Sequence, residues 1–151
     1  MAGTGFYGFQ NFSANIAGPG GEADLGNGAG VAEEGITIEA VQDQSTASYG
    51  ADGFVAHSLS AVTASNVTIR LDKLSPINAI LQEMFNLQSN SPALNGTNVI
   101  SMRDIASGDV LLLTDVAFSK RPAINYAKEA GMNEWVFIAG HTSQILGGGL
   151  L

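Results

Sequence analysis

Residues 67–88 read VTIRLDKLSPINAILQEMFNLQ, and the hydrophobic spacing changes halfway along this stretch. The alternating apolar residues of its first part are Val67, Ile69 and Leu71. That period of two predicts a β-strand with one buried face, running from about residue 62 to 72. In the second part apolar residues recur every three or four positions, as in an amphipathic helix. Ser75 is a good N-cap and Pro76 suits the first helical position, so a helix over about 76–88 is expected.

The same alternation recurs in short segments separated by turn residues. The other expected strands are Phe12–Ala17, Val31–Asp43, Ser45–Tyr49, Thr97–Arg103, Val110–Ser119 and Asn133–Ser143. The pair 97–103 and 110–119 reads as a hairpin around a turn at 106–109. The pattern predicts a mainly β (α+β) fold, an antiparallel β-sandwich or barrel with one packed α-helix. The length, 151 residues, fits a single domain over 1–151.

Two segments stand out among the strands. Residues 18–30 hold six glycines and a proline, which predicts a long loop of the kind that often binds a partner. The strand 31–43 is expected to carry acidic residues on one face and apolar residues on the other. The acidic face has Glu33, Glu39 and Asp43, together with Thr37, opposite Ile36, Ile38 and Ala40. Gly35, in the middle of this strand, suggests a β-bulge or a close backbone approach.

The composition favours a protein that assembles. Fourteen acidic against six basic residues give a net charge of −8, which excludes ordinary nucleic-acid binding because such binding needs basic residues to neutralise phosphates. Only 13% of residues are charged while 45% are hydrophobic, and depletion of charge is typical of interface cores. A surface rich in Ser, Thr, Asn and Gln is the alternative explanation. Met1–Gly8 lacks the pattern of a secretory signal, so an intracellular product is expected.

No constellation of catalytic, cofactor-binding or metal-binding residues is recognisable, so the chain is not expected to be an enzyme. The absence of cysteine excludes disulfides and thiolate chemistry. His57 and His141 have no histidine at ligand spacing, and residues 26–30 lack the GxGxxG pattern of a phosphate loop. The acidic residues Glu22, Asp24, Glu33 and Glu34 could in principle bind a hard cation, but their spacing is not that of an EF-hand.

A series of short strings, in this order and spacing, resembles the tail tube protein of contractile-tailed bacteriophages. The strings are Gly18–Gly21, Asp24–Gly26, Ala32–Ile38, Gly50–Gly53, His57–Leu59, Val67–Leu71, Lys73–Asn78, Asn125–Lys128 and Glu134–Trp135. The resemblance extends from about Ile16 to Trp135. The family is related in fold to the tube subunits of type VI secretion systems and pyocins.

The resemblance implies that six copies form a ring whose sheets join into one continuous barrel around a lumen. Rings would stack into a tube inside a contractile sheath, and no cofactor is implied. Its implied partners are further copies of the chain, the sheath protein, baseplate and tube-initiator proteins, a tape-measure protein in the lumen, and DNA in transit without specific binding. The implied location is the tail of a virion made in the host bacterial cytoplasm. A phage tail and a tailocin fit the resemblance equally.

Two site hypotheses follow from the resemblance. Glu33, Glu39 and Asp43 are candidate lumen-facing residues, with an outward solvated face as the alternative. The glycine-rich loop is a candidate ring-stacking element, and its residues are Gly18, Pro19, Gly20, Gly21, Glu22, Asp24, Gly26, Gly28 and Gly30. The C-terminal segment 145–151 is expected to be a flexible tail.

Two other functions compete with the tube. One is a monomeric β-sandwich binding module, for example for carbohydrate, and the other is a virion component such as a capsid decoration protein. A carbohydrate site needs an aromatic platform, whereas the aromatic cluster here, Phe6 to Phe12, lies near the N-terminus. A sheath subunit is disfavoured by the short chain.

Overall fold

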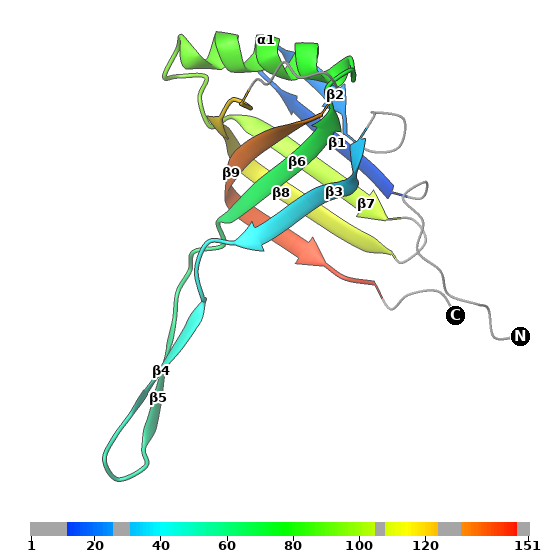
Figure 1. Ribbon diagram of the computed structural model, residues 1–151. Coiled ribbons are helices and arrows are strands. Elements are labelled where there is room, and N and C mark those ends of the chain that lie inside the picture. The colour runs from blue at the N-terminus through cyan, green and yellow to red at the C-terminus, as the bar shows by residue number, and fades with distance from the viewer. Residues whose placement is uncertain (1–11, 26–30, 105–107, 124–130, 148–151) are drawn as a thin grey trace, which may run out of the picture.

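The alternating segments of the chain pair into one seven-stranded antiparallel sheet and one separate hairpin (Figure 1). The computed structural model describes residues 12–25, 31–104, 108–123 and 131–147. The elements are β1 (Phe12–Gly18), β2 (Gly21–Asp24), β3 (Val31–Ala40), β4 (Ser45–Tyr49), β5 (Val55–Leu59), β6 (Ser65–Asp72), α1 (Ile77–Ser89), β7 (Asn98–Asp104), β8 (Asp109–Lys120) and β9 (Met132–Ile145). The expected mainly β, antiparallel fold with one helix is confirmed.

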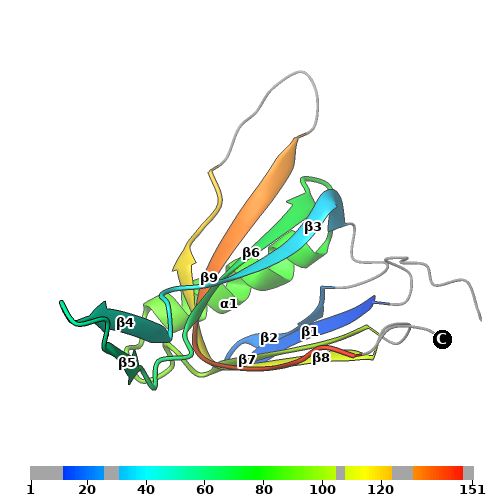
Figure 2. The same cartoon turned by 90° about the horizontal axis from the view of Figure 1, so that it is seen from below.

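The large sheet is bent into a V. Its strand order is β2-β1-β7-β8-β9-β6-β3, so the long strands β8 and β9 lie at its centre. Seen from below, β1, β2 and β7 form one arm, β3 and β6 form the other, and β8 and β9 run through the bend (Figure 2). The helix α1 lies across one end of the bent sheet (Figure 1). β2 and β3 are the two edges, and the part of the chain that the structure describes shows no pairing between them.

The bend is built where Asp115 of β8 lies opposite Gly140 of β9. Asp115 has a φ of 53°, and the register between β7 and β8 gains one residue at this point. A Cβ at Gly140 would lie 3.0 Å from the Cβ of Asp115, so a larger residue would require Asp115 to shift, and glycine accommodates this close approach of the strands. Leu113 and Val116 are both buried although they are three residues apart. The side of β8 that faces the core therefore switches from odd-numbered to even-numbered residues at the bend. Both halves of the strand thus face the same core.

The core fills the space between the two arms and α1. Its buried apolar residues are Ala14, Ile16, Ala23, Leu25, Val67, Ile69, Leu71, Leu81, Met84, Ile100, Met102, Leu113, Val116, Trp135, Phe137 and Ala139. Phe118 joins the helix to the sheet, because its ring centroid lies 5.7 Å from that of Phe85 and 4.7 Å from that of Phe137. The expected buried face of the strand at 62–72, which carries Val67, Ile69 and Leu71, is thus confirmed.

The helix begins at Ile77 because of the residues that precede it. The Oγ of Ser75 accepts a hydrogen bond from the Ile77 N–H at 3.3 Å, and Pro76 already has helical φ and ψ. The Asn78 side chain donates to the Asp72 carbonyl oxygen at 2.8 Å and accepts a hydrogen bond from Trp135 Nε1 at 3.0 Å. The predicted capping by Ser75 is confirmed, and the helix bounds differ from the expected 76–88 by one residue at each end.

The expectation of an unstructured loop over 18–30 is wrong for its first half. The chain turns at Pro19-Gly20, where Gly20 has a φ of 100°, and returns as strand β2, which pairs with β1. Ala23 and Leu25 are buried, so this segment has a face that packs on the core. The many glycines around it led to the prediction of a loop. Residues 26–30 lie outside the described part of the chain.

Three further differences concern strand boundaries. The strand expected over 31–43 ends at Ala40, and β5 was not expected at all. The strand β9 extends to Ile145, the first residue of the segment expected to be a tail, and the Gly147 N–H donates to Asp109 Oδ1 at 2.8 Å. The remaining tail residues 148–151, and residues 105–107 of the expected turn, lie outside the described residues.

Candidate assembly surfaces

The residues expected to be poor candidates for chemistry lie far apart. His57 is exposed in β5, and His141 Nε2 lies 3.3 Å from Asp115 Oδ2 on the exposed side of the bend. Glu22 and Asp24 are in β2. Within the described ranges, no group of three or more acidic or histidine side chains is placed to hold a metal ion, nor does any helix have the length and apolar character to cross a membrane.

Of the acidic residues predicted to share one face of the third strand, Glu39 is described within the strand. Glu39 and Thr37 are exposed on one face of β3, and Ile36 and Ile38 on the other face pack against the core. The register shifts between Val31 and Ile36, around Gly35, which has a φ of 64°. The predicted bulge at Gly35 is confirmed.

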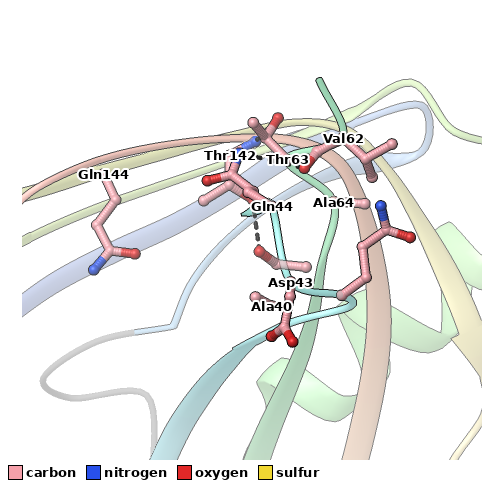
Figure 3. Close-up of a pocket in the computed structure, with 10 residues that line it drawn as sticks. Ala40, Asp43, Gln44, Val62, Thr63, Ala64, Thr142 and Gln144 are labelled. Atoms are coloured by element: carbon pink, nitrogen blue, oxygen red, sulfur yellow. Dashed lines mark hydrogen bonds between the residues drawn. The ribbon is translucent and has the colours of Figure 1, made fainter. Parts of the chain in front are cut away.

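Asp43 is separated from Glu39, because it lies beyond the end of β3. It lines a hollow of about 460 Å³ at the base of the β4–β5 hairpin (Figure 3). The residues around this hollow are Ala40, Gln42, Asp43, Gln44, Val62, Thr63, Ala64, Ser65, Thr142 and Gln144. The Thr142 hydroxyl hydrogen-bonds the Ser65 hydroxyl at 2.8 Å. The side chain of Glu33 lies outside what the structure describes, so of the three acidic candidates only Glu39 is seen on an exposed strand face.

The β4–β5 hairpin is the feature of the molecule that most requires a partner. It extends away from the bent sheet, well clear of the core (Figures 1 and 2), and every residue of β4 and β5 is exposed. Its large apolar side chains include Tyr49, Phe54 and Leu59, which are 76%, 70% and 82% exposed. Two-stranded hairpins are marginally stable alone, and clustered exposed apolar groups mark protein contact sites.

A tight turn holds the tip of the hairpin together. The Gly50 N–H donates to the Phe54 carbonyl oxygen at 2.7 Å, and Asp52 Oδ1 accepts the Phe54 N–H at 3.1 Å. Gly53 has a φ of 86°. The strand at 45–49 was expected from the sequence. The returning strand was missed, although Val55 and Leu59 resume the alternation two residues after the turn.

A second exposed surface lies on the outer side of the sheet. A groove of about 390 Å³ crosses β1, β7 and β8, and its exposed lining residues are Ser13, Asn15, Ser101, Arg103, Val110 and Leu112, with Met102 and Leu111. Val110 and Leu112 are 45% and 43% exposed. Apolar side chains on the solvent side of an antiparallel sheet are unusual, since that side is ordinarily polar.

A family model described as the bacteriophage PhiTE tail tube protein matches residues 4–147. No curated protein matches the chain significantly.

The fold is shared with solved structures of contractile injection systems. A chain of the PVC sheath–tube complex, an extracellular contractile injection system in its extended state, superposes with a TM-score of 0.57 at 8% identity, covering 90% of this chain and 88% of the other. A chain of the anti-feeding prophage cap, the AFP tube-terminating cap, superposes with a TM-score of 0.57 at 10% identity, covering 97% and 95%. With the family model spanning nearly the whole sequence, the expected resemblance to tail tube proteins is confirmed: the chain belongs to the family of the bacteriophage PhiTE tail tube protein, a family of structural, non-enzymatic tail components.

Proposed function

We propose that this chain is the repeating subunit of a tail tube, in which hexameric rings stack into a hollow cylinder inside a contractile sheath. The observation that carries the proposal is the β4–β5 hairpin, which extends away from the sheet and exposes its apolar side chains. Such an element gains stability only when another molecule covers it. The membership in a tail tube family makes further copies of the same chain its natural cover.

Ring closure is proposed to use the two edges of the bent sheet. β2 and β3 each leave one side without a strand partner among the described residues. Pairing β2 of one copy with β3 of the next would satisfy these backbone groups and remove the hazard of an exposed edge. Repeated six times, the same pairing would produce one continuous barrel around a lumen.

Ring stacking is proposed to involve the hairpin and the segment 18–30 together. In this segment Glu22 and Asp24 are exposed, whereas Gly18 and Pro19 are half-buried. Because residues 21–24 form an edge strand, the segment is better tested by substitution than by deletion. Glu22→Arg is expected to lower tube length without changing the fold, and Glu83→Arg on the exposed side of α1 is the matched control. Full-length tubes from the Glu22→Arg protein would remove this segment from the stacking contact.

The lumen is proposed to be acidic. The chain has a net charge of −8, and a wall of the same sign as DNA repels the duplex instead of binding it. Glu39 is the best supported lumen residue because it is exposed on the outer face of β3. Glu33 and Asp43 remain proposed lumen residues as well. The tube would thus conduct DNA, with a tape-measure protein occupying the lumen beforehand.

The remaining partners are proposed from the family. They are the sheath protein around the tube and baseplate or initiator proteins at its end, in a virion tail made in the host bacterial cytoplasm. The solved neighbour with a sheath–tube complex is consistent with a sheath partner.

Negative-stain electron microscopy of the purified protein, with light scattering on a sizing column, tests the proposal. The expected result is rings or hollow tubes of uniform width with six-fold end views. A variant in which residues 45–59 are replaced by a short glycine linker is expected to fold but to form no tubes. A wild-type protein that stays monomeric at every concentration, also when baseplate or initiator proteins are supplied, would contradict the proposal and favour a monomeric binding module.

A further inference from the structure

The two faces of the β4–β5 hairpin differ in the size of their side chains. Residues directly opposite each other in an antiparallel pair share a face. The pairs Tyr49–Val55, Ala47–His57 and Ser45–Leu59 therefore lie on one face, and the pairs Ser48–Ala56 and Thr46–Ser58 lie on the other. All the large side chains of the two strands are on the first face, which we call the broad face. The other, small face carries only Ser, Thr and Ala.

We propose that the broad face docks in the groove over β1, β7 and β8 of the next copy of the chain. This inference rests on the proposed tube function and assigns both sides of one contact between copies. The hairpin extends away from its own body (Figure 1), so the broad face is available to another molecule. Tyr49, Val55 and Leu59 would lose solvent contact on docking, at a gain of about 25 cal/mol per Å² of apolar area buried.

The groove has the composition of an interface. Ser101 pairs with Leu112, and Arg103 pairs with Val110, so these four side chains form one block on the outer side of β7 and β8. Ser13 and Asn15 on β1 lie beside Arg103 and Ser101 in register. The apolar residues of β8 thus have a polar border on β1, which is the arrangement of a protein contact with an apolar centre and a polar rim.

The charges of the two surfaces are complementary. Arg103 is the one charged residue that lines the groove, and no carboxylate of the described residues lies within ion-pair distance of it. The hairpin and its base, residues 41–64, contain Asp43 and Asp52 but no lysine or arginine. In a chain with a net charge of −8, most contacts between copies are repulsive. The contact between a cationic groove and an acidic hairpin is attractive instead, so it selects which surfaces of two copies meet and in which orientation.

The contact would also be able to propagate. The hairpin and the groove are different surfaces of one molecule, so a copy that receives a hairpin still has its own hairpin free. Heterologous contacts of this kind generate open assemblies, whereas a self-complementary contact closes as a dimer. A tube of indefinite length needs the heterologous kind.

Cross-linking tests the assignment directly, because the chain has no cysteine of its own. Protein carrying Tyr49→Cys is mixed with protein carrying Leu112→Cys, assembled and treated with a short bis-maleimide. We expect the cross-linked dimer to form at least about tenfold faster than in a matched mixture with Ser48→Cys in place of Tyr49→Cys. The two hairpin positions are adjacent in sequence and lie on opposite faces. Equal rates in assembled tubes would overturn the assignment.

Charge reversal gives a second, independent readout. Asp52→Arg and Arg103→Asp are each expected to raise the protein concentration needed for assembly by about tenfold, as for a close interfacial charge pair, and the double variant is expected to restore it. If the double variant assembles like the wild type, Asp52 and Arg103 interact between copies. A defect in the Asp52 turn could not be repaired by altering Arg103. If the double variant does not recover assembly, the proposed docking is wrong. Tubes formed by the wild-type protein would still support the tube function in that case. Wild-type protein that forms neither rings nor tubes contradicts the tube function and this inference with it.

Discussion

Gln88 and Asn98 exchange two amide hydrogen bonds inside the subunit. The Nε2 of Gln88 donates to Asn98 Oδ1 at 2.8 Å, and the Nδ2 of Asn98 donates to Gln88 Oε1 at 2.7 Å. Gln88 also donates to the Pro19 carbonyl oxygen, and Asn98 donates to the Val116 carbonyl oxygen. The pair therefore joins the end of α1 to β7, β8 and the turn after β1. A Cβ at Gly18 would overlap the Asn98 amide, which explains the glycine there.

Asn98→Ala is expected to destabilise the subunit by about 2–3 kcal/mol, because it leaves the buried amide of Gln88 without its main partner. Urea unfolding followed by circular dichroism measures the change. Asn86→Ala, on the exposed side of α1, is the control and should stay within about 0.5 kcal/mol of wild type. Equal midpoints for the two variants would show that the amide pair contributes nothing to stability.

Gly140→Ala is expected to cost about 1–3 kcal/mol, since the added methyl group would press on Asp115 at the bend of the sheet. Gly131→Ala is the matched control because a Cβ there meets no atom within 4 Å. Thermal unfolding of both variants makes the comparison. If Gly140→Ala unfolds at the wild-type temperature, the close approach of β8 and β9 does not require glycine.

Phe118→Ala and Phe54→Ala should separate folding from assembly. Phe118 packs between Phe85, Trp135 and Phe137, so its loss is expected to lower the free energy of unfolding by about 3 kcal/mol. Phe54 is 70% exposed at the hairpin tip, so its loss should leave the unfolding midpoint unchanged and reduce tube formation in light scattering. Tubes of normal yield from Phe54→Ala would argue against a role of the hairpin tip in assembly.

Glu39→Lys is expected to slow genome ejection if Glu39 lines the channel, because a cation on the wall would retain the DNA phosphates. The measurement is the rate of DNA release from particles whose tails assemble normally. Glu83→Lys makes the same charge change on the exposed side of α1 and should have no effect on release. Wild-type ejection from particles carrying Glu39→Lys would place that residue outside the lumen.

Much of the secondary structure could be predicted from local spacing. Val67, Ile69 and Leu71 are buried as their alternation indicated. The candidate acidic ladder was less predictable. The strand β3 ends at Ala40, so Asp43 lies outside it, and the register with β6 shifts around Gly35.

The sequence by itself determined where the helix and most of the strands form, because the period of the apolar residues shows which face each segment buries. The short strands β2 and β5 were not predicted. Ser75 and Pro76 likewise set the start of α1 through contacts within a few residues. The order of the strands, the bend at Asp115 and Gly140, and the direction of the hairpin were decided only by the tertiary structure. These features depend on pairing between segments far apart in the chain. Such pairing is governed by packing in the shared core and not by the spacing of residues along any one strand.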